Sequence, residues 1–172
     1  MSKTSDEPAR RQIAKYSGGA MFELGCHLID PLVRILGTPQ KVTPFNRKTR
    51  LDDDLLDNTL AVFEYPAATA TIRSALVEVD GFRRRQFVVC GDQGTLVIRP
   101  LEAPIVELTL SQPRGVYPQG KSVVQLPESP GRYDGAWQAL ARVIHGEGEF
   151  PFTHEHDYAV QKAILAASGM LP

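Results

Sequence analysis

The sequence predicts an α+β fold: a mostly antiparallel, open-faced sheet of about six strands with helices on one face. Apolar residues recur at helical spacing near both ends of the chain, whereas from Lys41 to Gln125 they recur with a period of two. Short turn-forming segments separate the predicted strands, as expected of antiparallel hairpins. Because helices and strands occupy separate stretches of the chain, the pattern indicates the α+β class.

Length and composition fit a folded domain and exclude several classes of protein. The chain has 172 residues, of which 42% are hydrophobic and 23% are charged, and its net charge is −1. A nearly neutral chain lacks the basic field that a nucleic-acid binder needs. We recognise no apolar run long enough for a membrane span and no secretion signal. With only two cysteines, Cys26 and Cys90, we expect a cytoplasmic protein with reduced thiols.

A polar segment is expected to precede the folded domain. Residues 1–15 are assigned to a polar tail, and the part from Met1 to Gln12 has no apolar periodicity and is expected to be frayed. Residues 16–172 are then expected to form a single domain, in which we find no internal repeat and no low-complexity tract.

The first predicted helix follows a pair of glycines. Gly18-Gly19 opens an apolar segment, Met21–Leu36, in which apolar residues fall at helical spacing and which Gly37 ends. Pro31 lies inside this segment, and we interpret the whole segment as one helix that is kinked at the proline. The alternative is a shorter helix with Asp30 as its N-cap and Pro31 as its first residue.

The middle of the chain is predicted to form strands, and its end two helices. Strand alternation is clearest at Val106–Ser111, where apolar and polar residues take turns. Helical spacing returns in two C-terminal segments, and Thr153 is the expected N-cap of the second. The predicted strands are 59–65, 69–79, 85–90, 95–99 and 106–111, and the helices lie around 137–144 and 160–167.

Four polar residues interrupt the apolar face of the first helix. Glu23, His27, Asp30 and Arg34 are spaced at i, i+4, i+7 and i+11, so they form one stripe. A carboxylate one turn before a histidine can fix the tautomer of the imidazole and raise its basicity, which suits acid–base catalysis at a carbinol. The alternative is a buried histidine satisfied by the neighbouring acid, with Asp30 as a helix cap.

Two motifs carry a resemblance to a known family. The segment Gly18–Asp30 resembles the GGG-x-x-x-D-x-G-x-H-x-x-D signature of the Gfo/Idh/MocA oxidoreductases, which include glucose–fructose oxidoreductase and inositol dehydrogenase. Phe87–Leu96 is similar to the v-x-G-x-x-G-t-l hairpin of that family. The resemblance covers about residues 10–169 and only the C-terminal, substrate-binding and oligomerisation domain of the family. It implies that Glu23 and His27 are catalytic, and Glu23 stands where aspartate is usual.

The resemblance implies a role in NAD(P)-dependent oxidation or reduction. The expected substrate is a sugar, a polyol or a related carbinol, and the expected catalytic residues are His27 and Glu23. We further predict Asp30 and Arg11 as substrate-binding residues. The substrate itself, and the choice between NAD and NADP, do not follow from these residues.

The resemblance also implies a cofactor for which this sequence shows no binding loop. Family members bind NAD or NADP on an N-terminal Rossmann domain, whose glycine-rich loop joins a strand to a helix. Gly146–Gly148 follows a predicted helix and Gly91–Gly94 lies in a predicted hairpin, so neither segment fits that loop. We therefore expect a fragment or split part that is inactive alone. A separate Rossmann-domain chain is the expected source of the cofactor and of a catalytic lysine.

The predicted strands also favour self-association. In the strand 59–65, Ala61 and Phe63 point to one side while Leu60 and Val62 point to the other, so both faces carry apolar groups. Helices on one side cannot cover both faces, and a large exposed apolar face is unusual for a monomer. We expect a homo-oligomer that forms through the sheet face. The alternative function is a non-catalytic oligomerisation or interaction domain that retains the fold.

Four weaker signals are interpreted as structural. His154 and His156 are two residues apart at a helix start and point away from each other, so we predict no metal site there. Asp52–Asp54 is expected to be a solvated turn, because it lacks the glycine and distal glutamate of a calcium loop. Arg83–Arg85 is expected to be an exposed strand entry. Cys26 is expected to be a core cysteine. Side chains at adjacent helix positions point in different directions, so its thiol is not expected to act together with His27.

Overall fold

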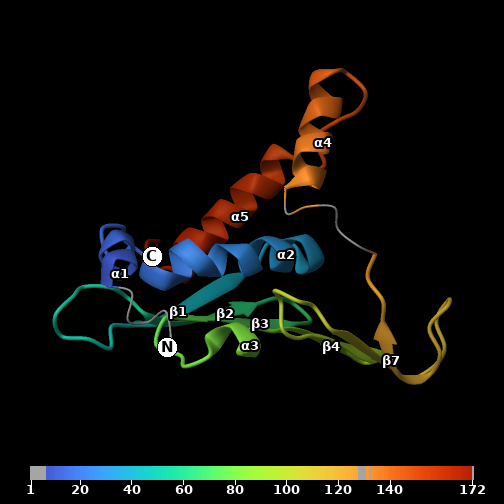
Figure 1. The fold of residues 1–172 in the computed structure, drawn as a ribbon, viewed down its shortest axis with the longest axis horizontal. Coiled ribbons are helices and arrows are strands. Elements are labelled where there is room, and N and C mark those ends of the chain that lie inside the picture. Colours follow the sequence, from blue (N-terminus) through green and yellow to red (C-terminus); the bar gives the residue numbers. More distant parts are fainter. Residues whose placement is uncertain (1–6, 128–130, 132, 172) are drawn as a thin grey trace. The chain divides into compact units, whose positions relative to one another are not determined.

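The computed structural model of the protein describes residues 7–127, 131 and 133–171. The chain divides into two compact units, Met1–Val79 with Ala139–Pro172, and Asp80–Gln138. Figure 1 shows the helices and strands of both units, most of them labelled. Our expectation of one domain over residues 16–172 stays a prediction.

The α+β class predicted from the sequence is confirmed. All strand pairs are antiparallel, but the seven strands among the described residues form two sheets, β1-β2-β3 and β4-β5-β6-β7, where one sheet of about six strands was expected. The division falls where a short helix, α3 (Gly81–Arg84), follows β3 and the left-handed residue Asp80 (φ 54°). That interruption ends the regular alternation before residue 79, the predicted end of the strand.

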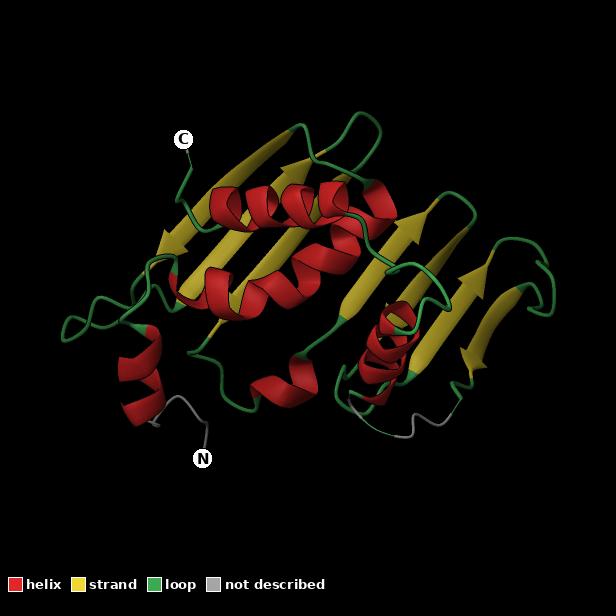
Figure 2. Ribbon diagram, turned by 90° about the horizontal axis from the view of Figure 1, so that it is seen from above, coloured by secondary structure: helices red, strands yellow, loops and turns green. Residues whose placement is uncertain are grey.

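The first unit is built on the three-stranded sheet. Its strands are β1 (Lys41–Arg47), β2 (Asn58–Glu64) and β3 (Thr69–Ala75), with β2 in the centre. Pro44 is tolerated in β1 because this strand lies at an edge of the sheet. Figure 2 shows α2 and α5 lying side by side over one face of this sheet. The buried core between these layers consists of Met21, Ile29, Leu32, Val33, Ala61, Phe63, Ile72, Ala163, Ile164 and Ala167.

The helix that carries the polar stripe has two parts. A π-helix, η2 (Met21–Gly25), continues into the α-helix α2 (Cys26–Leu36), which ends at Gly37 (φ 78°). Pro31 lies inside α2, so the alternative of a shorter helix capped by Asp30 is wrong. A proline inside a helix costs about 3 kcal/mol. The burial of Leu32 and Val33 beside it offsets that cost, because each buried aliphatic side chain contributes about 2 kcal/mol.

The two C-terminal helices lie where the sequence predicts them. They are α4 (Asp134–Ile144) and α5 (His154–Ala167). The expected N-cap of α5 is confirmed, because the hydroxyl of Thr153 accepts a hydrogen bond from the backbone N–H of His156 at 3.2 Å. Among the described residues, no helix has the length and apolar character needed to cross a membrane.

The N-terminal segment differs from the expected frayed tail. Residues 1–6 lie outside the described part of the chain, but Glu7–Ile13 forms the helix α1. Arg10 is only 3% exposed, and its guanidinium forms ion pairs with Asp53 at 2.8 Å and with Asp57 at 3.0 Å. These long-range ion pairs hold the helix, and a search for apolar periodicity does not detect them. Asp52 and Asp54 are exposed, as expected of a solvated turn, whereas Asp53 between them is only 18% exposed and pairs with Arg10.

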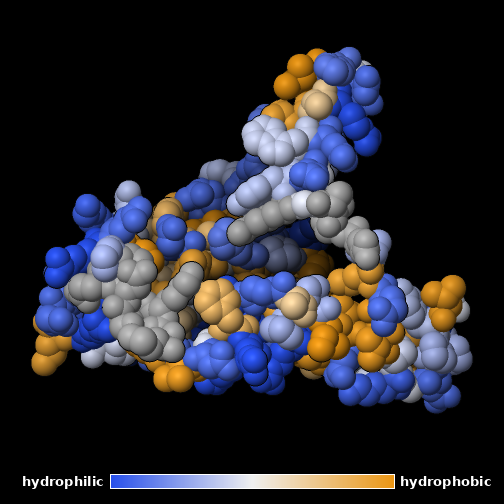
Figure 3. All heavy atoms as spheres, viewed as in Figure 1, coloured by the Kyte–Doolittle hydropathy of each residue, from blue (hydrophilic) through white to orange (hydrophobic). Residues whose placement is uncertain are grey.

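The second unit contains the four-stranded sheet. On one face of this sheet the paired strands place apolar residues next to one another, because Val89 pairs with Leu96 and Ile98 pairs with Val106. Figure 3 shows hydrophobic side chains gathered over these strands. The strands are β4 (Phe87–Gly91), β5 (Gly94–Ile98), β6 (Val106–Leu110) and β7 (Gly120–Val124).

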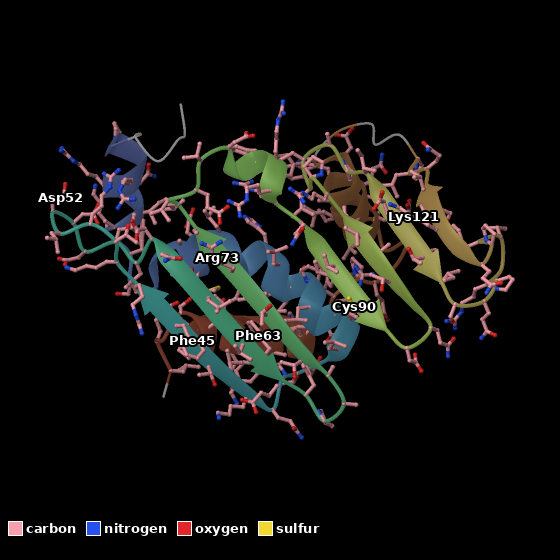
Figure 4. The ribbon with its side chains drawn as sticks, turned by 90° about the horizontal axis from the view of Figure 1, so that it is seen from below. Phe45, Asp52, Phe63, Arg73, Cys90 and Lys121 are labelled. Carbon is pink, nitrogen blue, oxygen red and sulfur yellow. The ribbon has the colours of Figure 1, made fainter. Side chains whose placement is uncertain are left out.

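The face of β1–β3 that points away from the helices is mixed in character. Figure 4 shows this side of the sheet, with Phe45 on β1 and Arg73 on β3. Phe45 is 46% exposed and pairs with Leu60 of β2, so an apolar centre lies among charged neighbours. Val77, within the segment 69–79 predicted to be a strand, lies beyond the end of β3 and does not contribute to this face.

Candidate functional site

The stripe of polar residues predicted from the sequence lies on η2 and α2. Glu23 belongs to η2, and His27, Asp30 and Arg34 belong to α2. Glu23 and His27 are exposed, whereas Ile29 on the same helix is fully buried in the core. The alternative of His27 as a buried core histidine is therefore wrong. The helix turns its apolar side to the sheet, which leaves both predicted catalytic side chains accessible to a ligand.

The Gly-Gly pair fixes the start of this helix. Gly18 and Gly19 have positive φ angles of 92° and 56°, which favour glycine. A Cβ atom on Gly19 would lie 2.5 Å from the carbonyl oxygen of Leu56, and that same oxygen accepts a hydrogen bond from the N–H of Ala20 at 2.9 Å. The glycines thus allow the loop around Leu56 to approach the beginning of η2, two residues before Glu23.

An acid–histidine pair joins α2 to the first turn of α5. Asp30 Oδ1 lies 2.8 Å from Nε2 of His156, and the side chains are 49% and 17% exposed, respectively. The ring of Phe152 stacks on His156 with 5.3 Å between centroids and 28° between planes. The guanidinium carbon of Arg34 lies 5.3 Å from the centroid of Phe152. Two residues of the stripe are therefore held by two aromatic side chains at the start of α5.

His156 is the site residue that the sequence analysis missed. We expected no metal site at His154 and His156, and we assigned His156 no other role. The sequence does place His156 in the first turn of a predicted helix and Asp30 on the polar stripe, and a histidine and an acid can pair. Nothing in the spacing connects two residues that are 126 positions apart.

In the part of the chain that the structure describes, the other predicted site residues are not brought together by hydrogen bonds or by a shared depression. Among the described residues, no hydrogen bond joins the side chains of Glu23 and His27. Arg11, on α1, lines a shallow depression whose lining residues do not include Glu23 or His27. Cys26 packs against the core as expected, and burial raises the pKa of its thiol, which disfavours the nucleophilic thiolate.

The glycines at Gly18–Gly19 and at Gly91 and Gly94 do not form a site for a dinucleotide. The space beside Gly19 is filled by Leu56, so the Gly-Gly pair serves packing and cannot hold a pyrophosphate. Gly91 and Gly94 pair with each other across a β-hairpin, which provides no helix N-terminus. No cluster of three or more metal-binding side chains occurs in the part of the chain that the structure describes.

A buried charge network supports the loop that contacts η2. Asp57 is fully buried and accepts hydrogen bonds from the backbone N–H and the hydroxyl of Thr49 at 2.9 and 2.8 Å, in addition to the Arg10 contact. Burial works to raise the pKa of Asp53, but hydrogen bonds from Arg10 and the Leu55 N–H, with the nearby positive charges, lower it overall.

The comparison with known families decides the assignment of the chain. Residues 2–97, more than half of the chain, match the GFO/IDH/MocA C-terminal domain. The chain belongs to this family. The matched segment contains the stripe from Glu23 to Arg34 and ends within β5, so it does not include His156. A comparison with curated proteins found no match.

Solved structures of oxidoreductases share the fold of this GFO/IDH/MocA domain. An oxidoreductase from Agrobacterium radiobacter, in complex with NAD+, L-tartaric acid and magnesium, has a TM-score of 0.66 at 16% identity, with 86% of this chain and 45% of that chain covered. A protein from Desulfitobacterium hafniense, proposed to be an NADPH-dependent oxidoreductase, has a TM-score of 0.69 at 19% identity, with 88% and 45% covered. An NAD-binding protein from Listeria innocua has a TM-score of 0.59 at 20% identity, with 88% and 46% covered. The chain thus spans about half the length of these proteins.

Proposed function

We propose that this GFO/IDH/MocA domain is the substrate-binding part of an NAD(P)-dependent oxidoreductase that acts on a sugar, a polyol or a related carbinol. Family membership supports the oxidoreductase class, and the names of two structural neighbours support a nicotinamide cofactor. The observation that carries the proposal is the exposure of Glu23 and His27 on a helix whose other side is fully buried.

Glu23 and His27 are proposed to act on the hydroxyl group of the carbinol. A neutral imidazole can accept the hydroxyl proton through its unprotonated nitrogen, and a nearby carboxylate stabilises the imidazolium that results. The carboxylate of Asp30 is hydrogen-bonded to the imidazole of His156. We therefore propose that Asp30 contributes to substrate binding together with that imidazole. The nicotinamide cofactor supplies the hydride acceptor or donor when it is bound elsewhere in the enzyme.

The cofactor site is proposed to lie on a Rossmann domain outside the described residues. The glycine pairs described above do not fit a pyrophosphate, and the solved neighbours are about twice as long as this chain. Under this proposal the present chain binds the carbinol but transfers no hydride until the Rossmann domain is added.

The proposal is tested by titrating the chain with myo-inositol, sorbitol and glucose and measuring binding by calorimetry. We expect at least one of these ligands to bind, and we expect the His27→Gln and Glu23→Gln variants to weaken that binding about tenfold or more, because a hydrogen bond to a ligand hydroxyl is lost. His145→Gln is the matched control, since His145 is an exposed histidine outside the stripe. Binding that the His27 variant does not change would contradict the assignment.

We further propose that the domain forms a homo-oligomer through the face of β1–β3 that points away from the helices. The apolar centre of that face, formed by Phe45, Leu60 and Val62, supports the proposal. The charged residues around this centre are those expected at the rim of an interface. Self-association is compatible with either catalysis or a purely structural role, and ligand binding at the stripe separates the two.

A further inference from the structure

Among the described residues, Asp30 and His156 are in direct hydrogen-bond contact, which the predicted catalytic pair of the stripe, Glu23 and His27, is not. Their side chains form a hydrogen bond of 2.8 Å, whereas no hydrogen bond joins Glu23 to His27 among the described residues. A carboxylate that contacts one ring nitrogen fixes which nitrogen carries the proton. Of the two histidines beside the stripe, the one that an acid orients by a hydrogen bond among the described residues is therefore His156.

The contact determines the chemical character of the other ring nitrogen. An ionised carboxylate can only accept hydrogen bonds, so Nε2 of His156 must carry the proton that faces Asp30. In the neutral imidazole Nδ1 is then an acceptor. Nδ1 makes no hydrogen bond with the described residues, and it is not among the buried side-chain atoms that lack a partner. Nδ1 is thus an acceptor that is not fully buried and that no described residue engages.

The surroundings of His156 restrict the movement of its ring. Phe152 stacks on the ring, Arg34 lies against Phe152, and the backbone N–H of His156 is bound by the N-cap hydroxyl of Thr153. Asp30 and Arg34 are four residues apart on α2, a spacing at which they could pair with each other. Instead, Asp30 contacts His156 and Arg34 contacts Phe152. Both stripe residues thus contribute to a preorganised imidazole.

We propose that His156 is a second substrate-contacting residue of the site, whose Nδ1 accepts a hydrogen bond from a hydroxyl group of the ligand. This inference rests on the proposed function and specifies the class of substrate. His27 lies about one helical turn before Asp30 on the same face of α2, and His156 contacts Asp30, so both histidines belong to the surroundings of the stripe. Two imidazoles beside one stripe fit a carbinol with at least two hydroxyl groups, and a simple alcohol can engage only one of them.

The tautomer of His156 tests the first part of this inference without any ligand. In the chain with nitrogen-15 histidines, long-range nitrogen–proton spectra distinguish a ring protonated at Nε2 from one protonated at Nδ1. We expect the Nε2-protonated form for His156, and we expect the Asp30→Ala variant to show a mixture of both forms. A ring protonated at Nδ1 in the unaltered chain would overturn the inference and leave the proposed function intact.

The contribution of His156 to binding is tested with a matched pair of variants. His156→Gln retains a donor for Asp30 but removes the ring acceptor, and His154→Gln changes an exposed histidine on the same turn of α5. With myo-inositol as the probe, we expect the first variant to bind about tenfold more weakly and the second to bind like the unaltered chain. Circular dichroism establishes that both variants are folded.

Each outcome of the binding experiment has a distinct meaning. If His27→Gln weakens myo-inositol binding and His156→Gln does not, the role of His156 is overturned while the proposed function stands. If 2-propanol, which has one hydroxyl group, binds as tightly as myo-inositol, the requirement for two hydroxyl groups is overturned. If the unaltered chain binds neither myo-inositol nor sorbitol nor glucose, the proposed function and this inference fail together.

Discussion

Arg10 shows how single charged residues determine the structure around the stripe. It is almost fully buried and contacts two carboxylates, one of which, Asp57, is also fully buried. Buried charges are stable only when they are paired and hydrogen-bonded, and Asp57 meets this condition through Arg10 and Thr49. A polar N-terminal sequence gives no sign of such a network, because its partners lie more than 40 residues away.

Removing Arg10 is expected to destabilise the domain strongly. Arg10→Leu leaves the buried carboxylate of Asp57 without its cationic partner, and the loss of one member of a buried ion pair costs about 3 kcal/mol or more. Urea unfolding of the variant measures this loss. Lys15→Met, which changes an exposed cation shortly after α1, is the control and is expected to alter stability by less than about 0.5 kcal/mol.

The same network predicts a dependence of stability on acid pH. The pKa of Asp53 is lower in the folded protein than in the unfolded chain, because the hydrogen bonds from Arg10 and the Leu55 N–H outweigh the effect of burial. Its stabilising contribution is therefore complete above the unfolded pKa of about 3.9 and is lost as the pH falls through the folded pKa. Urea unfolding between pH 6 and pH 3 should show this loss, and Arg10→Leu should reduce the slope. An unchanged slope in the variant would contradict the assignment.

The pairing of Asp30 with His156 marks the limit of prediction at the residue scale. Helical spacing identifies Glu23, His27 and Asp30 as one stripe, and the structure confirms that Glu23 and His27 are exposed. The partner of Asp30 could not be predicted, because it depends on how α5 packs over the sheet. A local pattern predicts which residues share a face of one helix, but the contact between two helices is set by the tertiary fold.

At the scale of elements, periodicity predicts the type of each segment better than its partners. The helix over Met21–Leu36 and the strands β2, β5 and β6 lie where the alternation indicates them. The separation into two sheets was not predicted, because period-two alternation carries no information on which strands pair. The π-helical geometry of η2 was also missed, because its apolar spacing resembles that of an α-helix.

The glycine pair before η2 provides a prediction at this scale. Gly19→Ala places a Cβ atom 2.5 Å from the carbonyl oxygen of Leu56, in addition to the strain of a positive φ angle. Gly146→Ala is the matched control, because Gly146 also has a positive φ angle but has no atom within 4 Å of the added Cβ. We expect the control to lose about 1 kcal/mol and Gly19→Ala to lose clearly more, as measured by thermal unfolding. Equal losses would show that the contact with Leu56 is unimportant.

At the scale of the whole molecule, the face of β1–β3 opposite the helices predicts self-association. Light scattering on the purified chain at tens of micromolar should give at least twice the chain mass of 18.9 kDa. Phe45→Glu introduces a charge at the apolar centre of this face and should shift the protein toward monomer. Val79→Glu, at an exposed position beyond β3, is the control and should leave the assembly unchanged. A monodisperse monomer of the unaltered chain would refute the proposed interface.

The central claim is that the stripe of this GFO/IDH/MocA domain binds a carbinol. The chain has four histidines, of which His27 and His156 lie at the stripe, whereas His145 and His154 are exposed elsewhere. Side-chain NMR spectra of these histidines during a titration with myo-inositol, sorbitol or glucose provide the most direct test. We expect the ring signals of His27 and His156 to shift with saturation while those of His145 and His154 stay in place. If no ligand moves the His27 signals, or if all four histidines respond alike, the stripe is not the carbinol site.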